Sequence, residues 1–149
     1  MNLGVSPETD RRQDWPARLD AYLRDCAARP FQYGAHDCAL FAAGAVAAVT
    51  GWDPAAAWRG AYDSLSSGQQ ALRAALGRVS LPQAVNRYLG RPHKLWRQAG
   101  RGDIAWVQDL LIDSRVLGVV DLSGERVAVA GAEGMIFAPT HAIRLVWKI

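Results

Sequence analysis

The fold of this 149-residue chain is decided by Tyr33-Gly34-Ala35-His36-Asp37-Cys38-Ala39-Leu40-Phe41, which continues as an almost wholly apolar run to Gly51. Asp37 is a good N-cap, because its carboxylate can accept hydrogen bonds from the free N–H groups of a helix's first turn. Gly51 is a good helix stop. The pattern predicts a helix over 38–50 that is buried on all sides, with the Cys38 thiol at its positive end. A thiol in that place is a candidate nucleophile.

The rest of the first 90 residues also carries helix signals. One helix is expected to begin at Asp14-Trp15-Pro16, with Asp14 as its cap, and to end at Arg29-Pro30. Cys26 continues the apolar stripe of that helix and is interpreted as a small core residue. Three more helices are expected: one over 54–59, one from a cap at Ser66 or Ser67 to a stop at Gly77, and one from Ser80 to Gly90.

The last third of the chain consists of short apolar runs that are typical of β-strands. The runs cover 104–107, 116–120, 126–130, 134–137 and 143–147, with a hairpin turn at 121–124. Helices followed by a meander of strands predict an α+β fold, with N-terminal helices packed on a C-terminal antiparallel sheet. The length suits one domain, which we place at 14–149 behind a polar N-terminal arm at 1–13.

The composition argues against several classes of protein. The formal charge is +3, and nearly all of the positive residues are arginines. We interpret these arginines as scattered along the chain and not clustered in a basic stripe. We therefore expect no nucleic-acid partner. No run reaches the roughly 20 apolar residues of a membrane span, and the first residues lack a signal peptide's pattern. The two cysteines form no Cys-x-x-Cys pair and no ligand pair has a recognised zinc spacing, so neither a metal nor another cofactor is expected.

Short motifs in the chain resemble those of a known family. Tyr33-Gly34, then Asp37-Cys38 opening an apolar helix, then Gly102-Asp103-Ile104 opening the first strand, resemble the NlpC-type cell-wall peptidases, which have a papain-like fold. The resemblance covers residues 30–130 and implies that Cys38 stands in the nucleophile position. It also implies a histidine base in a His-x-Gly pattern on the following strand, and an orienting polar residue on the strand after that.

The positions that should carry the base are apolar. Gly118 matches the family's glycine, which places Val116 at the base position and Ala128 near the position of the orienting residue. A thiol that attacks an amide needs a base to take its proton and return it to the leaving amine, and neither side chain can do this. Cys38 is therefore interpreted as a vestigial nucleophile, and this interpretation argues against an enzyme. The alternative is an active nucleophile whose base comes from a different position.

Three histidines are available for a rearranged base. His36, two residues before the thiol, is a weak candidate for the catalytic partner. His93 lies in a connection and His141 lies before the last strand, and no motif supports either of them.

A narrower resemblance covers nearly the whole chain. The stretches 31–41, 50–53 with 59–62, and 146–149 are similar to a group of phage and prophage tail proteins that are related to the peptidases but lack their histidine. This resemblance implies a structural component of a long-tailed phage tail tip or baseplate, found in the virion and made in the host cytoplasm. The implied partners are other tail-tip or hub proteins, and tail symmetry leaves a homo-oligomer open. Three tryptophans are candidate interface anchors, namely Trp52, Trp96 and Trp147.

The alternative function is an active cysteine peptidase or amidase that degrades peptidoglycan during phage DNA entry. It requires a base near Cys38 from outside the family's usual positions. The group that lies nearest to the Cys38 sulfur therefore discriminates between the two functions.

Overall fold

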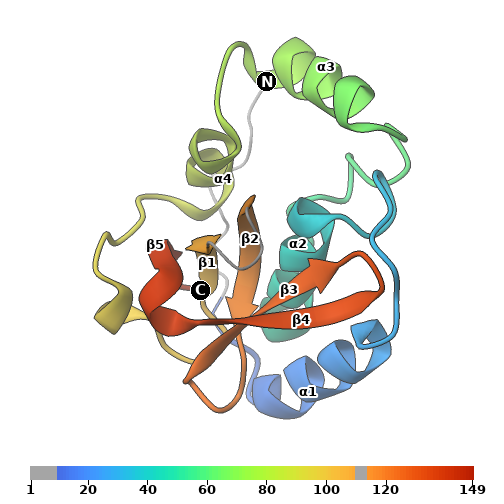
Figure 1. The fold of residues 1–149 in the computed structure, drawn as a ribbon. Coiled ribbons are helices and arrows are strands. Elements are labelled where there is room, and N and C mark those ends of the chain that lie inside the picture. The colour runs from blue at the N-terminus through green and yellow to red at the C-terminus, as the bar shows by residue number, and fades with distance from the viewer. Residues whose placement is uncertain (1–9, 110–113) are drawn as a thin grey trace.

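The helices come first along the chain and the strands follow (Figure 1), which confirms the α+β class. The computed structural model describes residues 10–109 and 114–149. The helical elements are α1 (Trp15–Cys26), α2 (Cys38–Thr50), α3 (Leu65–Leu76), α4 (Leu81–Leu89) and the 3-10 turns η1 (Trp96–Gln98) and η2 (Thr140–Ala142). The strands are β1 (Ile104–Asp109), β2 (Ser114–Val120), β3 (Arg126–Gly131), β4 (Gly134–Pro139) and β5 (Ile143–Trp147).

The five strands form one antiparallel sheet in the order β4-β3-β2-β1-β5. β2 pairs with β1 along its whole length, but it pairs with β3 only at Val119–Ala128 and Val120–Val127. The paired stretch begins just after Gly118. At Gly118 itself the backbones lie so close that a Cβ atom would be 2.4 Å from the Ala128 carbonyl oxygen. Glycine therefore allows β3 to pass close to β2, and the β3–β4 hairpin then turns across the front of the molecule (Figure 1).

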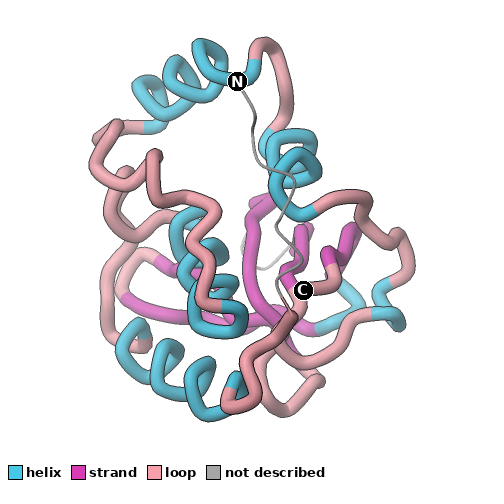
Figure 2. The backbone as a smooth tube through the Cα atoms, turned by 180° about the vertical axis from the view of Figure 1, so that it is seen from behind, coloured by secondary structure: helices cyan, strands magenta, loops and turns pink. Residues whose placement is uncertain are grey.

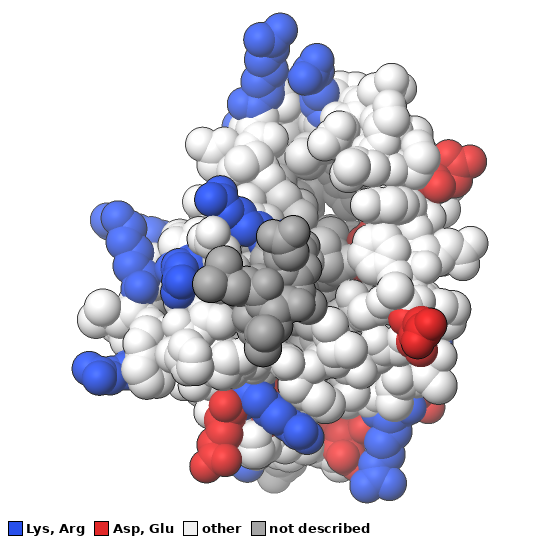
Figure 3. All heavy atoms as spheres, viewed as in Figure 1, with Lys and Arg blue, Asp and Glu red and all other residues white. Residues whose placement is uncertain are grey.

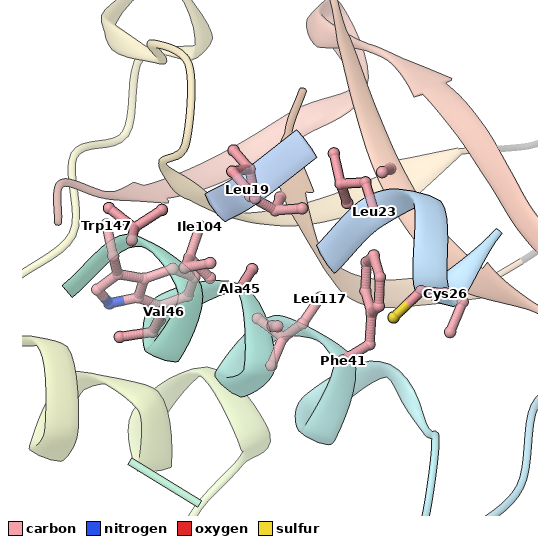
Figure 4. Close-up of a cluster of buried hydrophobic side chains, with 14 residues drawn as sticks. Leu19, Leu23, Cys26, Phe41, Ala45, Val46, Ile104, Leu117 and Trp147 are labelled. Atoms are coloured by element: carbon pink, nitrogen blue, oxygen red, sulfur yellow. The ribbon is translucent and has the colours of Figure 1, made fainter. Parts of the chain in front are cut away.

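The main core lies between α1, α2 and one face of the sheet (Figure 4). Small side chains along α2 let the neighbouring elements approach closely: the Tyr22 ring rests on Gly44, and its hydroxyl donates to the Phe41 carbonyl over 2.7 Å. Cys26 is 1% exposed within this cluster, so its interpretation as a core residue is confirmed. Burial of an aromatic such as Phe41 stabilises the fold by about 1.5–3 kcal/mol, which makes α2 the centre of the domain.

The helices α3 and α4 lie at the upper end of the sheet (Figures 1 and 2), where α4 packs Leu81, Val85 and Leu89 against the main core. Each begins with a capping box, from Ser64 for α3 and from Ser80 for α4. Two side-chain hydrogen bonds tie α4 to the body. Asn86 accepts from the Trp147 indole over 2.9 Å, and the Tyr88 hydroxyl accepts from the Trp58 indole over 2.9 Å.

Five local predictions are wrong. The α3 cap is Ser64, not Ser66 or Ser67, because the Ser67 hydroxyl instead completes the capping box. Residues 54–59 form turns and no helix, because the Asp53 carboxylate binds the Ala55 N–H and the Arg59 guanidinium. Asp14 makes no capping bond and pairs with Arg18 instead, and α1 ends at Cys26, before Arg29-Pro30. Trp147 is fully buried, so it is no interface anchor.

A buried carboxylate joins the two ends of the described chain. Asp103, which is fully buried, accepts hydrogen bonds from Arg11 over 2.9 Å, from the Gly100 N–H over 2.8 Å and from Lys148. Arg11 also donates to the Ile149 carbonyl over 2.6 Å. Within the predicted N-terminal arm at 1–13, residues 1–9 lie outside the described residues, Arg11 binds this cluster, and the Arg12 N–H donates to the Val49 carbonyl over 2.8 Å.

No helix in the described parts of the chain combines the length and the apolar character that a membrane crossing requires.

We expect Asp103→Ala to lower the free energy of unfolding by about 3 kcal/mol, because both cations lose their partner at a buried position. This is the lower end for a broken buried ion pair, since the two cations are partly exposed. Urea unfolding followed by circular dichroism measures the loss. Arg18→Ala, which breaks an exposed pair on α1, is the control and should cost under about 1 kcal/mol. Equal losses in the two variants would contradict a structural role for Asp103.

Candidate functional site

The candidate site is built around the carboxylate of Asp37, at the head of α2. One oxygen accepts from the Leu40 N–H over 2.9 Å, which confirms the predicted N-cap. The other accepts from the Gly34 N–H over 3.0 Å and from the Tyr62 hydroxyl. Asp37 is 4% exposed, so these bonds replace those that water would otherwise make. Three segments of the chain are thereby fixed around the residue that follows, Cys38.

Glycine at position 34 makes this arrangement possible. Gly34 has a φ of +82°, and a Cβ there would lie 1.8 Å from the Tyr62 carbonyl oxygen. The Gly34 carbonyl in turn accepts from the Gly60 N–H over 2.9 Å. The sequence did not predict Tyr62 as a site residue. Its presence in the stretch 59–62, quoted for the phage resemblance, was the one available signal.

The Cys38 thiol is not activated by its position. Burial is the largest influence and raises the pKa of Cys38 above its ordinary value, and the Asp37 charge raises that pKa further. Backbone N–H groups of Leu117 and of the first turn of α2 act in the opposite direction, but they are the weaker influence. The thiol therefore stays protonated at neutral pH, where a cysteine nucleophile needs the thiolate.

A pocket of about 530 Å³ opens beside Cys38, between α2, the turns of 54–62, α3, α4 and the neighbouring ends of β1 and β2. Its lining is mainly apolar, with side chains such as Leu40, Leu72, Leu81 and Ile104. Asp37, Tyr62 and Arg115 add polar groups at its lining. Such a concave, mostly apolar site with a few polar groups is typical of a ligand-binding pocket.

The structure separates His36 from the thiol. The His36 ring lies edge-on against Phe41, with centroids 5.7 Å apart, and His36 does not line the pocket that contains Cys38. His36 is 3% exposed and its Nε2 has no hydrogen-bond partner in the described chain. Burial, followed by the nearby charge of Arg29, lowers the pKa of His36. His36 is therefore a buried ring packed against Phe41, outside the pocket that Cys38 lines.

The other candidate positions are also accounted for. His93 is exposed, and its backbone pairs with Val146 at the edge of β5. His141 is exposed in η2. Val116 lines the pocket together with Cys38, whereas Ala128 is fully buried in the core beside Val119. The position predicted for a base thus does lie at the site, and it holds an apolar side chain.

Within residues 10–109 and 114–149, no group of three or more His, Cys, Asp or Glu is arranged to hold a metal ion.

Comparison with known proteins gives one match. A family model described as "Domain of unknown function (DUF6950)" matches residues 10–149. The search of curated proteins and the search of solved structures gave no match.

We expect Asp37→Ala to lower the free energy of unfolding by about 2–4 kcal/mol, because two buried N–H groups and the partly buried Tyr62 hydroxyl lose a charged acceptor. Ser80→Ala is the matched control: it removes the exposed cap of α4 and should cost about 1 kcal/mol. Chemical unfolding of both variants gives the comparison. A loss in Asp37→Ala no larger than that of the control would mean that this carboxylate acts as an ordinary cap.

The raised pKa of Cys38 predicts slow alkylation. In a Cys26→Ala background at pH 7.5, iodoacetamide should modify Cys38 more slowly in the native chain than in the same chain unfolded in urea. As the pH is raised, the native alkylation rate should increase with a midpoint pH above that of a free cysteine. Mass spectrometry over a pH series measures both rates. A native midpoint below that of the unfolded chain would show an activated thiolate.

Proposed function

The chain belongs to the DUF6950 family, and we propose that it is a structural component of the tail tip or baseplate of a long-tailed phage, built on a peptidase-like fold without the peptidase reaction. The observation that carries the proposal is the state of Cys38. The thiol stands at the head of a buried helix and lines a pocket together with Val116, the residue at the position where the resemblance expects the base.

The peptidase reaction makes two demands that the described residues around Cys38 do not meet. Attack on an amide requires a thiolate, and release of the amine requires a proton donor within about 3–4 Å of the reacting atoms. Burial and the charge of Asp37 oppose the thiolate. The imidazole nearest in sequence, His36, is packed against Phe41 instead. These facts support a site whose Asp37-Cys38 helix start is retained for its role in the fold and not for catalysis.

The assignment to a phage tail rests on the sequence resemblance of the stretches 31–41, 50–53 with 59–62, and 146–149. The contacts of these stretches are consistent with a structural role. Asp37 in the first stretch binds Tyr62 in the second, and Trp147 in the third binds Asn86 of α4. The residues that carry the resemblance therefore hold segments of the domain together, as expected of an assembly module. Other tail-tip or hub proteins are its proposed partners.

An active peptidase or amidase acting on peptidoglycan is the second candidate. The pocket of about 530 Å³ beside Cys38 favours it, because a peptide substrate needs a concave site at the nucleophile. This function would require a base brought by a partner or by a rearrangement of the loop that carries His36.

One experiment separates the two functions. A phage or prophage that encodes the chain is given Cys38→Ala, and particle assembly, infectivity and hydrolysis of purified peptidoglycan are compared with wild type. We expect unchanged assembly and infectivity, no wild-type hydrolysis above background, and the protein in purified tails by mass spectrometry. Asp37→Ala, which disturbs the frame, should reduce assembly and serves as the contrasting variant.

Hydrolysis by the wild-type chain that disappears in Cys38→Ala would establish the enzyme instead. Absence of the protein from purified tails would exclude the structural assignment, whatever the state of the thiol.

A further inference from the structure

The positive charge of this chain is concentrated in one segment. Residues 64–102 contain seven Lys and Arg and no Asp or Glu, whereas the other 110 residues contain ten Lys and Arg against fourteen Asp and Glu. The seven residues are Arg73, Arg78, Arg87, Arg91, Lys94, Arg97 and Arg101. The expectation of scattered positive charge is therefore wrong, since the modest total of +3 is the sum of a cationic segment and acidic flanks.

These seven cations are all exposed, and none of them forms a salt bridge with a carboxylate in the described chain. Of the ten other cations, six pair with an aspartate in the described chain, namely Arg11, Arg18, Arg24, Arg59, Arg126 and Lys148. The segment supplies α3, α4 and the connection to β1. In Figure 3, the charged side chains at the top and along the left of the molecule are Lys and Arg, whereas Lys and Arg lie beside Asp and Glu at the bottom.

Exposed apolar side chains lie among these charges. Leu95 is 65% exposed and Trp96 is 38% exposed, and the Arg97 guanidinium lies 5.1 Å from the centroid of the Trp96 ring. Two contacts hold the backbone around Leu95 and Trp96 in place. The His93 backbone pairs with Val146, and Lys148 donates to the Gln98 carbonyl over 2.8 Å. The segment thus presents a flat aromatic ring between cations on a backbone anchored to β5.

We propose that this basic surface, defined as the seven cations of 64–102 together with Trp96, binds single-stranded nucleic acid. Guanidinium groups pair with phosphates, and an exposed ring held beside an arginine offers a stacking platform for an unpaired base. Clustered Lys and Arg with interleaved aromatics are the electrostatic footprint of this class of ligand.

The distribution of charge favours nucleic acid over an acidic protein. Seven like charges run over two helices and a loop with no acidic residue among them, which matches an extended polymer of uniform charge. Protein surfaces usually intersperse the two signs, so a protein partner would need an equally long acidic surface. This inference goes beyond the proposed tail function and does not depend on it.

Fluorescence anisotropy of the full chain with a labelled 20-nucleotide oligo-dT, from 50 to 200 mM NaCl, tests the proposal. We expect binding that weakens steeply as the salt concentration rises. The variant K94Q/R97Q should bind about tenfold or more weakly, with the slope of log Kd against log salt reduced by about 1.4, since each phosphate contact on a single strand contributes about 0.7. The variant R18Q/R24Q removes the same charge from α1 and should stay within twofold of wild type.

Trp96→Ala tests stacking separately from charge, because it leaves the net charge unchanged. It should weaken oligo-dT binding about tenfold while changing the affinity for a 20-base-pair duplex less than threefold. Circular dichroism melting confirms that these surface variants remain folded.

Three results would overturn the proposal. The first is no binding of oligo-dT at 50 mM NaCl. The second is an equal loss in R18Q/R24Q and K94Q/R97Q, which would mean attraction to net charge alone. The third is binding of poly-L-glutamate with the same affinity and the same dependence on Trp96, which would point to an acidic protein instead.

Discussion

The carboxylate of Asp37 is the interaction on which the surrounding structure depends. Its two oxygens accept hydrogen bonds from the Leu40 N–H at the start of α2, from the Gly34 N–H in the preceding turn and from the Tyr62 hydroxyl. The cap and the turn are local, whereas the bond to Tyr62 joins residues 25 positions apart. Because all three donors lie in a largely buried region, no water can replace the carboxylate at comparable cost. The start of α2, and with it the centre of the core, is therefore defined by one side chain.

The same carboxylate also acts on the next residue, Cys38, although burial is the larger influence on its pKa. A helix N-terminus favours a thiolate, and the first-turn amides do lower the pKa of Cys38. Burial outweighs them, and the negative charge of Asp37 adds to the burial effect. The net effect is a pKa of Cys38 above its ordinary value.

The chain also divides its electrostatic roles between two regions. In the body, aspartates are matched to cations, as Asp103 is to Arg11 and Lys148, and these pairs hold the fold. In the segment 64–102, the cations have no salt bridge to a carboxylate among the described residues, although the Arg101 guanidinium lies 5.6 Å from the centroid of the Trp15 ring. A region that carries unpaired like charge at a cost in self-repulsion is more readily explained by recognition of a partner than by stability.

The sequence by itself determined the class and order of the elements, because capping residues, glycine stops and apolar periodicity act within a few positions; α2 with Asp37 and Gly51 is the clearest case. It also identified the apolar Val116 at the site. Contacts between distant residues decided the rest. The Tyr62 bond, the separation of His36 from Cys38 and the burial of Trp147 depend on how elements pack, and no local pattern encodes them. The pKa of Cys38 likewise follows from tertiary burial, because desolvation exists only once the pocket and the core have formed.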